Sequence, residues 1–394
     1  MANRQGMLLP LLLENVKDER KGSMMDVAVF SPVGDLGQMD IFYKTVRKLG
    51  IADSVDFIFI YRKGLEYPST GLSALHATEK YPLGTSGCFF AGQALCYLLG
   101  YKTVVVADLD SVLDSGATLA GMEEMAHRLG HAVLPEYRIK ENTADIASNV
   151  NNWGVYPREV FEKAGFSTPY IWKGSEDYEF FARLSHLRMV EIYRDGYYSH
   201  HFSGFTVYHK MGEKKKYYPY INGTLKAILF VADYSKAAYF NYCLWYVFYS
   251  FFADAFEDRW LRAVVAPAHK FEIVGSPIED GGKEYFTVKR VKEVGSFSNT
   301  SQFRMLLVPY SLVRLALTGK YEVYRDVVEL KVSRPIFMLR LLAGAVRMPL
   351  RALEAAMNLL QWRGERKKVH FPATPENLES VEKEFAALAR DRCI

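Results

Sequence analysis

The first two-thirds of the chain alternates short apolar runs with longer segments of helical periodicity. Short runs of β-branched and aromatic residues are typical of buried strands, and apolar residues that repeat every three or four positions are typical of helices. The expected strands are 26–30, 55–61 and 103–107, and the expected helices are 38–49, 86–99 and 117–128. Shorter apolar pieces at 132–135 and 153–156 extend the edge of the same sheet. This alternation predicts an α/β fold with a Rossmann-like, mostly parallel sheet.

The pattern changes near residue 225. Residues 225–256 are aromatic and apolar with helical periodicity, and 302–318 and 335–362 return to helix. Between them, 269–294 alternates and contains Gly281–Gly282, which predicts a β-hairpin insertion. We therefore expect three regions. They are an N-terminal extension over 1–25, an α/β domain over 26–225, and a largely helical, amphipathic C-terminal region over 226–394.

Residues 331–368 form a basic amphipathic segment. They include nine basic and two acidic residues. Arg340, Arg347, Arg351, Glu354 and Asn358 fall on one helical face, and the rest of the surface is mainly Leu, Ala, Met and Phe. A helix that packs on a core through a broad apolar face fits this pattern as well as a helix that lies on a membrane. The basic cluster at the end of the segment favours anionic lipid, so we expect docking on a membrane surface.

Composition limits the remaining classes. The net charge of +4 is too small to indicate nucleic-acid binding. The four cysteines lack metal-ligand spacing, which favours a reducing compartment.

Residues 237–253 are apolar but Tyr-rich and interrupted by Asn241, so we interpret them as a buried or interfacial helix and keep a spanning helix as the alternative. We expect no signal peptide and a peripheral or monotopic protein at the cytoplasmic face of the membrane. The aromatic stretch 239–256 can also serve as the face of a homo-oligomer.

The apolar run 101–107 ends in two carboxylates, Asp108 and Asp110. Open α/β sheets bind ligands at the carboxyl ends of their strands. Two hard oxygen ligands at such an end suit Mn²⁺ or Mg²⁺ carrying phosphates. An isolated Asp-x-Asp also occurs at solvated strand ends, so the neighbouring motifs decide between the two interpretations.

Three further motifs accompany the acidic strand end. Pro82–Gly92 is a turn of small residues that opens a helix and lets backbone approach a ligand closely. Glu176 and Asp177 follow a loop that contains Trp, and they open an amphipathic helix. Carboxylates there favour the helix dipole, and they are equally typical of a general base. His200 and His201 follow a strand and can complete a metal site with Asp110, while Lys214–Lys216 can shield a diphosphate.

In the order and spacing of these four motifs, the chain resembles the family 2 inverting glycosyltransferases of the GT-A fold. It is most similar to the branch that contains galactofuranosyl- and rhamnosyltransferases. That branch has an Asn-Leu-Gly-x-x-Gly-x-Phe-x-x-Gly turn, an Asp-x-Asp strand end, a Trp-containing segment, an Asp-Asp-x-Glu motif and a later His. The corresponding residues are Leu83–Gly92, Asp108 and Asp110, Trp153, Glu176-Asp177-Tyr-Glu179, and His200 or His201. The resemblance covers residues 26–225.

The chain departs from the family pattern at several places, and three of them lie at the expected site. Pro82 replaces the Asn before Leu-Gly, and Glu176 replaces the first Asp of the acidic pair. The second strand ends in Tyr61-Arg62-Lys63, where the family has an acidic residue that holds the nucleobase. These departures concern the recognition of the nucleotide and of the acceptor.

The resemblance implies a metal-dependent glycosyltransferase that uses a nucleotide-diphosphate sugar. The acceptor is a hydroxyl of a glycan or a lipid-linked glycan, and transfer inverts the anomeric centre. Asp177 acts as general base beside Glu176, and Trp153 and Glu176 contact the acceptor. The implied metal ligands are Asp110, Asp108, His200 and His201. The implied donor contacts are Ser31, Pro32, Arg62, Gly84, Ser86, Gly87 and Asp108.

Two other classes stay open at this point. A non-catalytic membrane-surface scaffold with a degenerate sugar-nucleotide fold is compatible with Pro82 and Glu176. A nucleotidyltransferase also uses a Gly-rich turn and acidic residues on an α/β sheet. It would carry a basic residue in the first strand-to-helix turn, which Ser31–Asp35 lacks.

Overall fold

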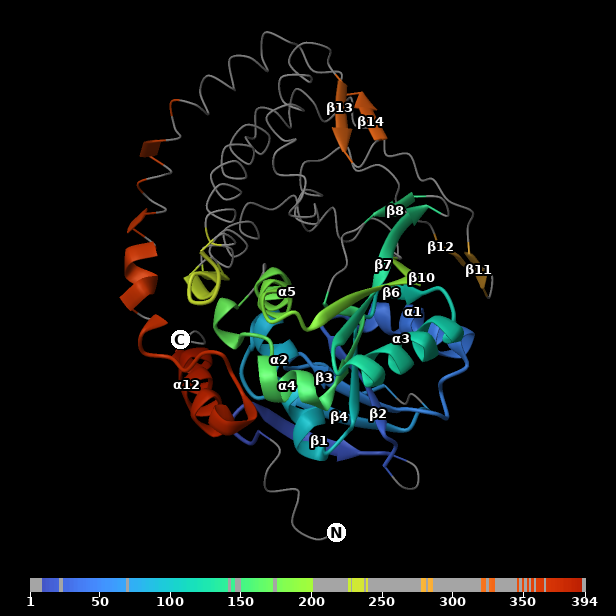
Figure 1. Ribbon diagram of the computed structural model, residues 1–394. Helices are drawn as coiled ribbons and strands as arrows, with labels where there is room; N and C mark the ends of the chain where they lie inside the picture. The colour runs from blue at the N-terminus through green and yellow to red at the C-terminus, as the bar shows by residue number, and fades with distance from the viewer. Residues whose placement is uncertain are drawn as a thin grey trace.

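The computed structural model describes most of the first half of the chain and parts of the second. The described ranges are 9–200 with gaps at 21–23, 69–70, 141–142, 146–149 and 173–175, then 226–239 with gaps, the short strands at 278–285 and 320–329, and 346–391 with gaps. A ten-stranded sheet forms the centre of the molecule (Figure 1).

The strands of this sheet come from residues 13–200. They are β1 (Leu13–Asp18), β2 (Val27–Val33), β3 (Asp56–Tyr61), β4 (Ala74–Glu79), β5 (Thr103–Ala107), β6 (Ser111–Leu113), β7 (Ala132–Lys140), β8 (Thr143–Asp145), β9 (Asn152–Pro157) and β10 (Val190–His200). Their order is β1-β4-β3-β2-β5-β9-β7-β10-β6, and β8 pairs with β7. Strands β2, β3, β4, β5, β7 and β10 run in one direction, while β1, β6, β8 and β9 run in the other. The expected α/β fold with a mostly parallel sheet is confirmed.

Alternate residues of the central strands enter two different cores. Val29 and Phe57 face α1 (Met39–Leu49) and α3 (Gly116–Leu129), whereas Phe30 and Ile58 face α2 (Gly84–Leu99). The second face is also covered by α4 (Arg158–Ala164), α5 (Glu176–His186) and α12 (Leu378–Asp391). Burial on both faces explains why β3 and β5 are continuous apolar runs.

The predicted elements of the α/β region match the structure closely. Strand 103–107 is β5, and the helices expected at 38–49, 86–99 and 117–128 are α1, α2 and α3. Strands β1, β4, β6 and β8 were not predicted, and β10 was expected only as a strand of undefined bounds before His200. In β4 the sequence Ala-Leu-His-Ala-Thr-Glu is polar at alternate positions, yet every one of its residues is buried. His76, for example, lies 3.0 Å from the Tyr61 hydroxyl through Nδ1, and this hydrogen bond offsets part of the cost of burying a polar side chain.

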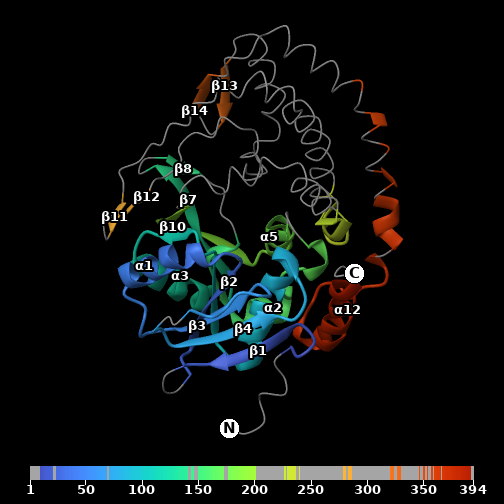
Figure 2. The same ribbon diagram turned by 180° about the vertical axis from the view of Figure 1, so that it is seen from behind.

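The two ends of the described chain pack on the same edge of the sheet. Strand β1 pairs antiparallel with β4, and the Leu11 amide donates a hydrogen bond to Glu382 of α12 over 2.8 Å. Figure 2 shows β1 and α12 beside each other from behind. Strand β1 lies in the expected N-terminal extension and α12 in the expected C-terminal region. The boundaries near residues 25 and 225 stay predictions.

The rest of the C-terminal region is described in pieces. Strands β11 (Ile278–Asp280) and β12 (Lys283–Tyr285) pair antiparallel inside the stretch where a hairpin is expected, and β13 (Lys320–Val323) pairs with β14 (Asp326–Glu329). Within the described residues, no helix is both long and apolar enough to cross a membrane. Apart from Tyr239, the segment 237–253 lies outside the described residues, as does most of the stretch considered as an oligomer face.

Candidate active site

Four carboxylates meet at the edge of the sheet where the parallel strands end. Asp108 and Asp110 follow β5, and Glu176 and Asp177 open α5. Burial raises the pKa of the Asp108 carboxyl well above its usual range. The negative charges of Asp110, Glu176 and Asp177 raise it further, so each of these three carboxylates lies close enough to interact with Asp108. We call these four residues the acidic cluster. The sequence predicted its members, and the fold brings them together.

The turn that carries Asp108 and Asp110 is held on both sides. The Asp108 amide donates to the Asn151 carbonyl over 2.9 Å, and the Ser111 hydroxyl donates to the Asp108 carbonyl over 2.7 Å. Trp153 Nε1 then donates to the Ser111 carbonyl over 3.1 Å. These bonds fix the backbone between β5 and β6, which presents the two carboxylates in a defined geometry.

The role expected for Trp153 is wrong. Its side chain is fully buried and stacks on Phe42 of α1, with ring centroids 6.1 Å apart and 12° between the planes. A ring in the core has no face left for a sugar. Trp153 instead supports the acidic turn through its hydrogen bond to Ser111.

Backbone pairing brings His200 towards the acidic turn. Strand β10 runs antiparallel to β6, with His200 opposite Ser111, one residue beyond Asp110. His201 and Lys214–Lys216 lie outside the described residues. In the described part of the chain, no group of three or more His, Cys, Asp or Glu side chains is arranged to hold a metal ion. Two carboxylates would leave the other coordination positions of a divalent cation to phosphate and water oxygens, as Mg²⁺ usually has, and Asp108 and Asp110 stay predicted ligands.

The small-residue turn is packed against the protein itself. The Ser86 hydroxyl donates to the Pro169 carbonyl over 3.0 Å, and its amide donates to the Trp172 carbonyl over 3.2 Å. At Gly87 a Cβ atom would lie 2.3 Å from the Phe385 ring of α12. Both residues are buried and make these contacts within the protein, and their expected contacts with a donor stay predictions. Gly84 is partly buried, with φ +68°, and its donor contact stays a prediction.

The remaining expected donor residues are Ser31, Pro32 and Arg62. Ser31 is fully buried, and its hydroxyl donates to the Ala107 carbonyl, which joins β2 to β5. This bond uses the side chain of Ser31 within the sheet, and its expected contact with a donor stays a prediction. Pro32 is partly buried at the end of β2 and Arg62 is exposed after β3, so both stay predictions.

One acidic residue at this edge was missed. Glu79 ends β4 and is 6% exposed, and burial raises the pKa of its carboxyl to about 7. The backbone amides of Leu83 and Lys63 and the charge of Arg62 oppose this rise. A carboxylate therefore does lie near Arg62, but on the neighbouring strand. Recognising 74–79 as a strand would have revealed it.

The third acid of α5 is structural. Glu179 is fully buried and forms an ion pair with Arg183 Nε at 3.1 Å. Thr168 and Tyr234 donate hydrogen bonds to the same carboxylate. The contacts of the buried Glu179 fix the orientation of α5. In this orientation Asp177, at the start of the same helix, is partly exposed and lies at the acidic cluster.

Comparisons with known proteins find only distant structural similarity. No protein-family model matches the chain, and no curated protein matches it. Among solved structures, TarS of S. aureus shares 9% identity over 67% of this chain and 60% of its own, with a TM-score of 0.43. The mannosyltransferase PcManGT from Pyrobaculum calidifontis, solved with GDP-Man and Mn²⁺, shares 11% identity over 96% of this chain and 89% of its own, with a TM-score of 0.38. GalNAc-T7, solved with UDP, GalNAc and Mn²⁺, shares 9% identity over 60% of this chain and 51% of its own, with a TM-score of 0.39. The chain thus spans about 60% of the length of TarS.

Proposed function

We propose that the protein is a metal-dependent, inverting glycosyltransferase of the GT-A type, with its catalytic domain over 26–225. It transfers a sugar from a nucleotide-diphosphate donor to a hydroxyl of a glycan or lipid-linked glycan. The observation that carries the proposal is the acidic cluster at the carboxyl ends of the parallel strands, where α/β sheets bind their ligands. The order of the motifs, which resembles family 2 glycosyltransferases, supports the same function.

The donor site is proposed beside β2, β3 and β5. Asp110, with Asp108, would hold Mn²⁺ or Mg²⁺. His200, whose backbone pairs with that of Ser111, is proposed as a further ligand. When bound, the cation would act as a Lewis acid that neutralises the leaving diphosphate. Asp108 supports this assignment because a cation would offset the charge repulsion within the cluster.

Asp177 is proposed as the general base. Its carboxylate accepts the proton of the acceptor hydroxyl while that oxygen forms a bond to the anomeric carbon. The bond between the anomeric carbon and the diphosphate oxygen breaks from the opposite face, and the electron pair leaves with the diphosphate. One displacement therefore inverts the anomeric centre. Glu176, which is 6% exposed beside Asp177, would hold a second acceptor hydroxyl.

Calorimetric titration with UDP, GDP and dTDP, each with Mn²⁺ and with a chelator, tests the donor site. We expect metal-dependent binding of one nucleotide and its loss in Asp110→Ala. Asp53→Ala is the matched control, because Asp53 is an exposed carboxylate just before β3, at the opposite end of the strand. Failure of all three nucleotides to bind would contradict the proposal and favour the scaffold class.

A further inference from the structure

An exposed row of large apolar side chains lies on the segment 346–366. The described residues from 346 to 364 are helical. The exposed residues are Val346, Leu350, Leu353, Met357 and Leu360, with 59–76% of each accessible. Steps of four, three, four and three residues place them on one helical face. We call this row the apolar stripe. Extended exposed apolar surface marks an interaction site in soluble proteins.

The sequence of this segment fits both a helix packed on a core and a helix lying on a membrane, and the exposure of its apolar side chains argues against the core. A helix that packs on a core would bury its large apolar residues, whereas here they face solvent. Three exposed cations, Arg363, Lys367 and Lys368, follow the stripe directly. An exposed apolar face that ends in a basic cluster complements an anionic bilayer, because the side chains enter the acyl region and the cations meet the phosphates.

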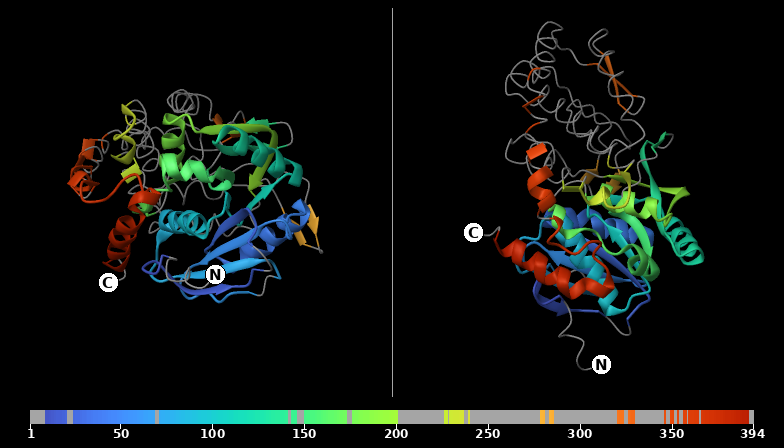
Figure 3. Two further views of the ribbon diagram at one scale, coloured as in Figure 1. Left: turned by 60° about the horizontal axis from the view of Figure 1, so that its bottom comes forward. Right: turned by 60° about the vertical axis from the view of Figure 1, so that its left-hand side comes forward.

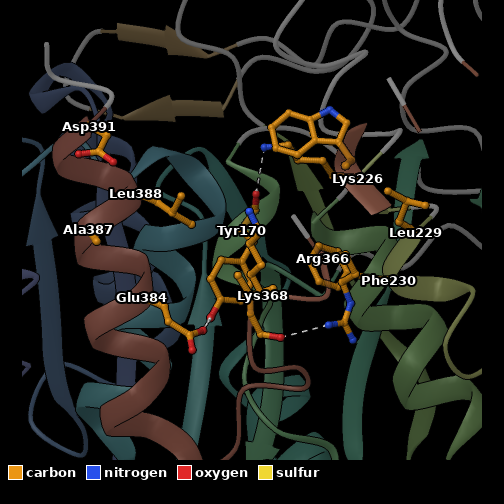
Figure 4. A pocket seen from close by; sticks show the side chains of 12 residues that line it. Tyr170, Lys226, Leu229, Phe230, Arg366, Lys368, Glu384, Ala387, Leu388 and Asp391 are labelled. Carbon is orange, nitrogen blue, oxygen red and sulfur yellow. Dashed lines mark hydrogen bonds between the residues drawn. The ribbon is translucent and has the colours of Figure 1, made fainter. Parts of the chain in front are cut away.

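The end of the segment packs on residues 226–234, and these contact the α/β domain. Lys226 donates to the Tyr170 carbonyl over 3.4 Å (Figure 4), and Tyr234 donates to the Glu179 carboxylate. The Lys226 ammonium lies 3.4 Å from the centre of the Trp362 ring. Arg366 forms an ion pair with Asp233, and its guanidinium lies 4.7 Å from the centre of the Phe371 ring. Lys226, Trp362 and Arg366 line one side of a cavity of about 350 Å³, and residues of α12 line another.

The attachment leaves the stripe itself free. Figure 3 shows the helical piece around 359–364 outside the sheet and beside α12. A surface held in this way would fix the orientation of the whole domain on whatever it contacts.

We propose that the apolar stripe, with Arg363, Lys367 and Lys368, docks the protein on a bilayer that contains anionic phospholipid. The same spacing also fits pairing with a second copy, but a pair of parallel helices would place two basic clusters side by side. A phosphate surface neutralises these charges, which is why the bilayer is favoured. The proposal needs neither a sugar donor nor a metal, so it can fail while the proposed glycosyl transfer holds.

Flotation with vesicles tests the docking. The probes are vesicles of phosphatidylcholine alone and of phosphatidylcholine with phosphatidylglycerol. We expect the protein to float with the second kind, and the double variant Leu353→Glu/Met357→Glu to lose at least about tenfold in binding. Leu129→Glu on α3 is the matched control, since Leu129 is an exposed Leu, 41% accessible, outside the stripe. It should float like the unchanged protein.

A second variant separates charge from apolar contact. Lys367→Gln/Lys368→Gln should weaken binding to the anionic vesicles by about thirtyfold at low salt, because each cation near an anionic surface contributes about 1 kcal/mol. Absence of flotation with anionic vesicles, or equal loss in Leu129→Glu, would overturn the proposal. So would a vesicle-free dimer in sedimentation that Leu353→Glu/Met357→Glu abolishes, which would assign the stripe to a second copy.

Discussion

At the scale of single residues, Glu79 combines deep burial with titration near neutral pH. Its carboxyl ends β4, beside the loop that begins at Arg62, and burial raises its pKa from 4.5 to about 7. A group of this kind makes folding stability depend on pH, because the folded and unfolded chains bind different numbers of protons.

The sign of this dependence follows from the direction of the shift. Between about pH 4.5 and 7 the folded protein keeps a proton on Glu79 that the unfolded chain has released. The contribution of Glu79 to the free energy of unfolding therefore falls as pH rises through this window and is constant above it. Urea midpoints across the window should decline less steeply in Glu79→Gln than in the unchanged protein. Identical slopes would show that Glu79 is not protonated in the fold.

Asp177 should affect transfer without affecting the donor. In Asp177→Asn we expect transfer to fall by about 10² to 10⁴, the usual contribution of a general base. The nucleotide identified by titration should bind with unchanged affinity. Initial rates of nucleoside diphosphate release, compared with Asp53→Asn, measure this. An equal loss of nucleotide binding would remove Asp177 from the role of base.

Trp153 should affect stability more than acceptor binding. Trp153→Phe keeps an aromatic ring against Phe42 but removes the donor to the Ser111 carbonyl. Loss of this bond should lower the free energy of unfolding by about 1–3 kcal/mol, measured by urea denaturation. The KM for the acceptor should not change. A large rise in that KM with unaltered stability would restore the sugar-binding role.

Residue types alone could not separate ligand contacts from internal contacts. Ser86, Gly87 and Trp153 have the chemistry of a sugar-nucleotide site, and the sequence pattern correctly marks positions of close approach. Their partners are Pro169, Phe385 and Phe42, which lie far away in the sequence. The close approach is real, but the protein itself makes it.

At the scale of elements, predictability follows the pattern of burial. Strands β2, β3 and β5 are buried on both faces and were found, because a short continuous apolar run is typical of a buried strand. Strand β10 contains Arg194-Asp195-Gly196, and its register with β7 shifts between Tyr193 and Tyr197. A strand interrupted by a bulge loses the regular alternation of side chains, so the sequence indicated a strand before His200 but not its bounds. Strand β10 still matters, because it carries His200 to the acidic turn.

Helix α12 should stabilise the α/β domain directly. Its Phe385 is 1% exposed and packs edge-on against Phe90 of α2 and Tyr170, with ring centroids 6.4 and 6.3 Å away. Phe385→Ala should lower the free energy of unfolding by about 3–5 kcal/mol, as other buried Phe truncations do. Denaturation monitored by circular dichroism measures this against Lys383→Ala, an exposed position of the same helix. Equal stability of the two variants would show that α12 is dispensable.

At the scale of the whole molecule, the candidate site was predictable because strand ends converge. Carboxylates that follow β5 and open α5 reach one edge of the sheet whatever the loops do between them. The packing of the C-terminal helix was not predictable, since it depends on contacts between residues hundreds of positions apart. The separation of the apolar stripe from the core was equally invisible, because an apolar helical face fits a core and a membrane alike.

The joining of β1 and α12 has a consequence for the order of synthesis. The Leu11 amide and the Glu382 carboxylate are 371 positions apart, and Gly87 receives the Phe385 ring from the same late helix. A ribosome therefore releases the whole sheet well before it releases the helix that closes one of its faces. During that interval α2 presents Phe90 to its surroundings without its final cover. The nascent chain is then most exposed to aggregation and to chaperone capture, and emergence of residues 378–391 ends that period.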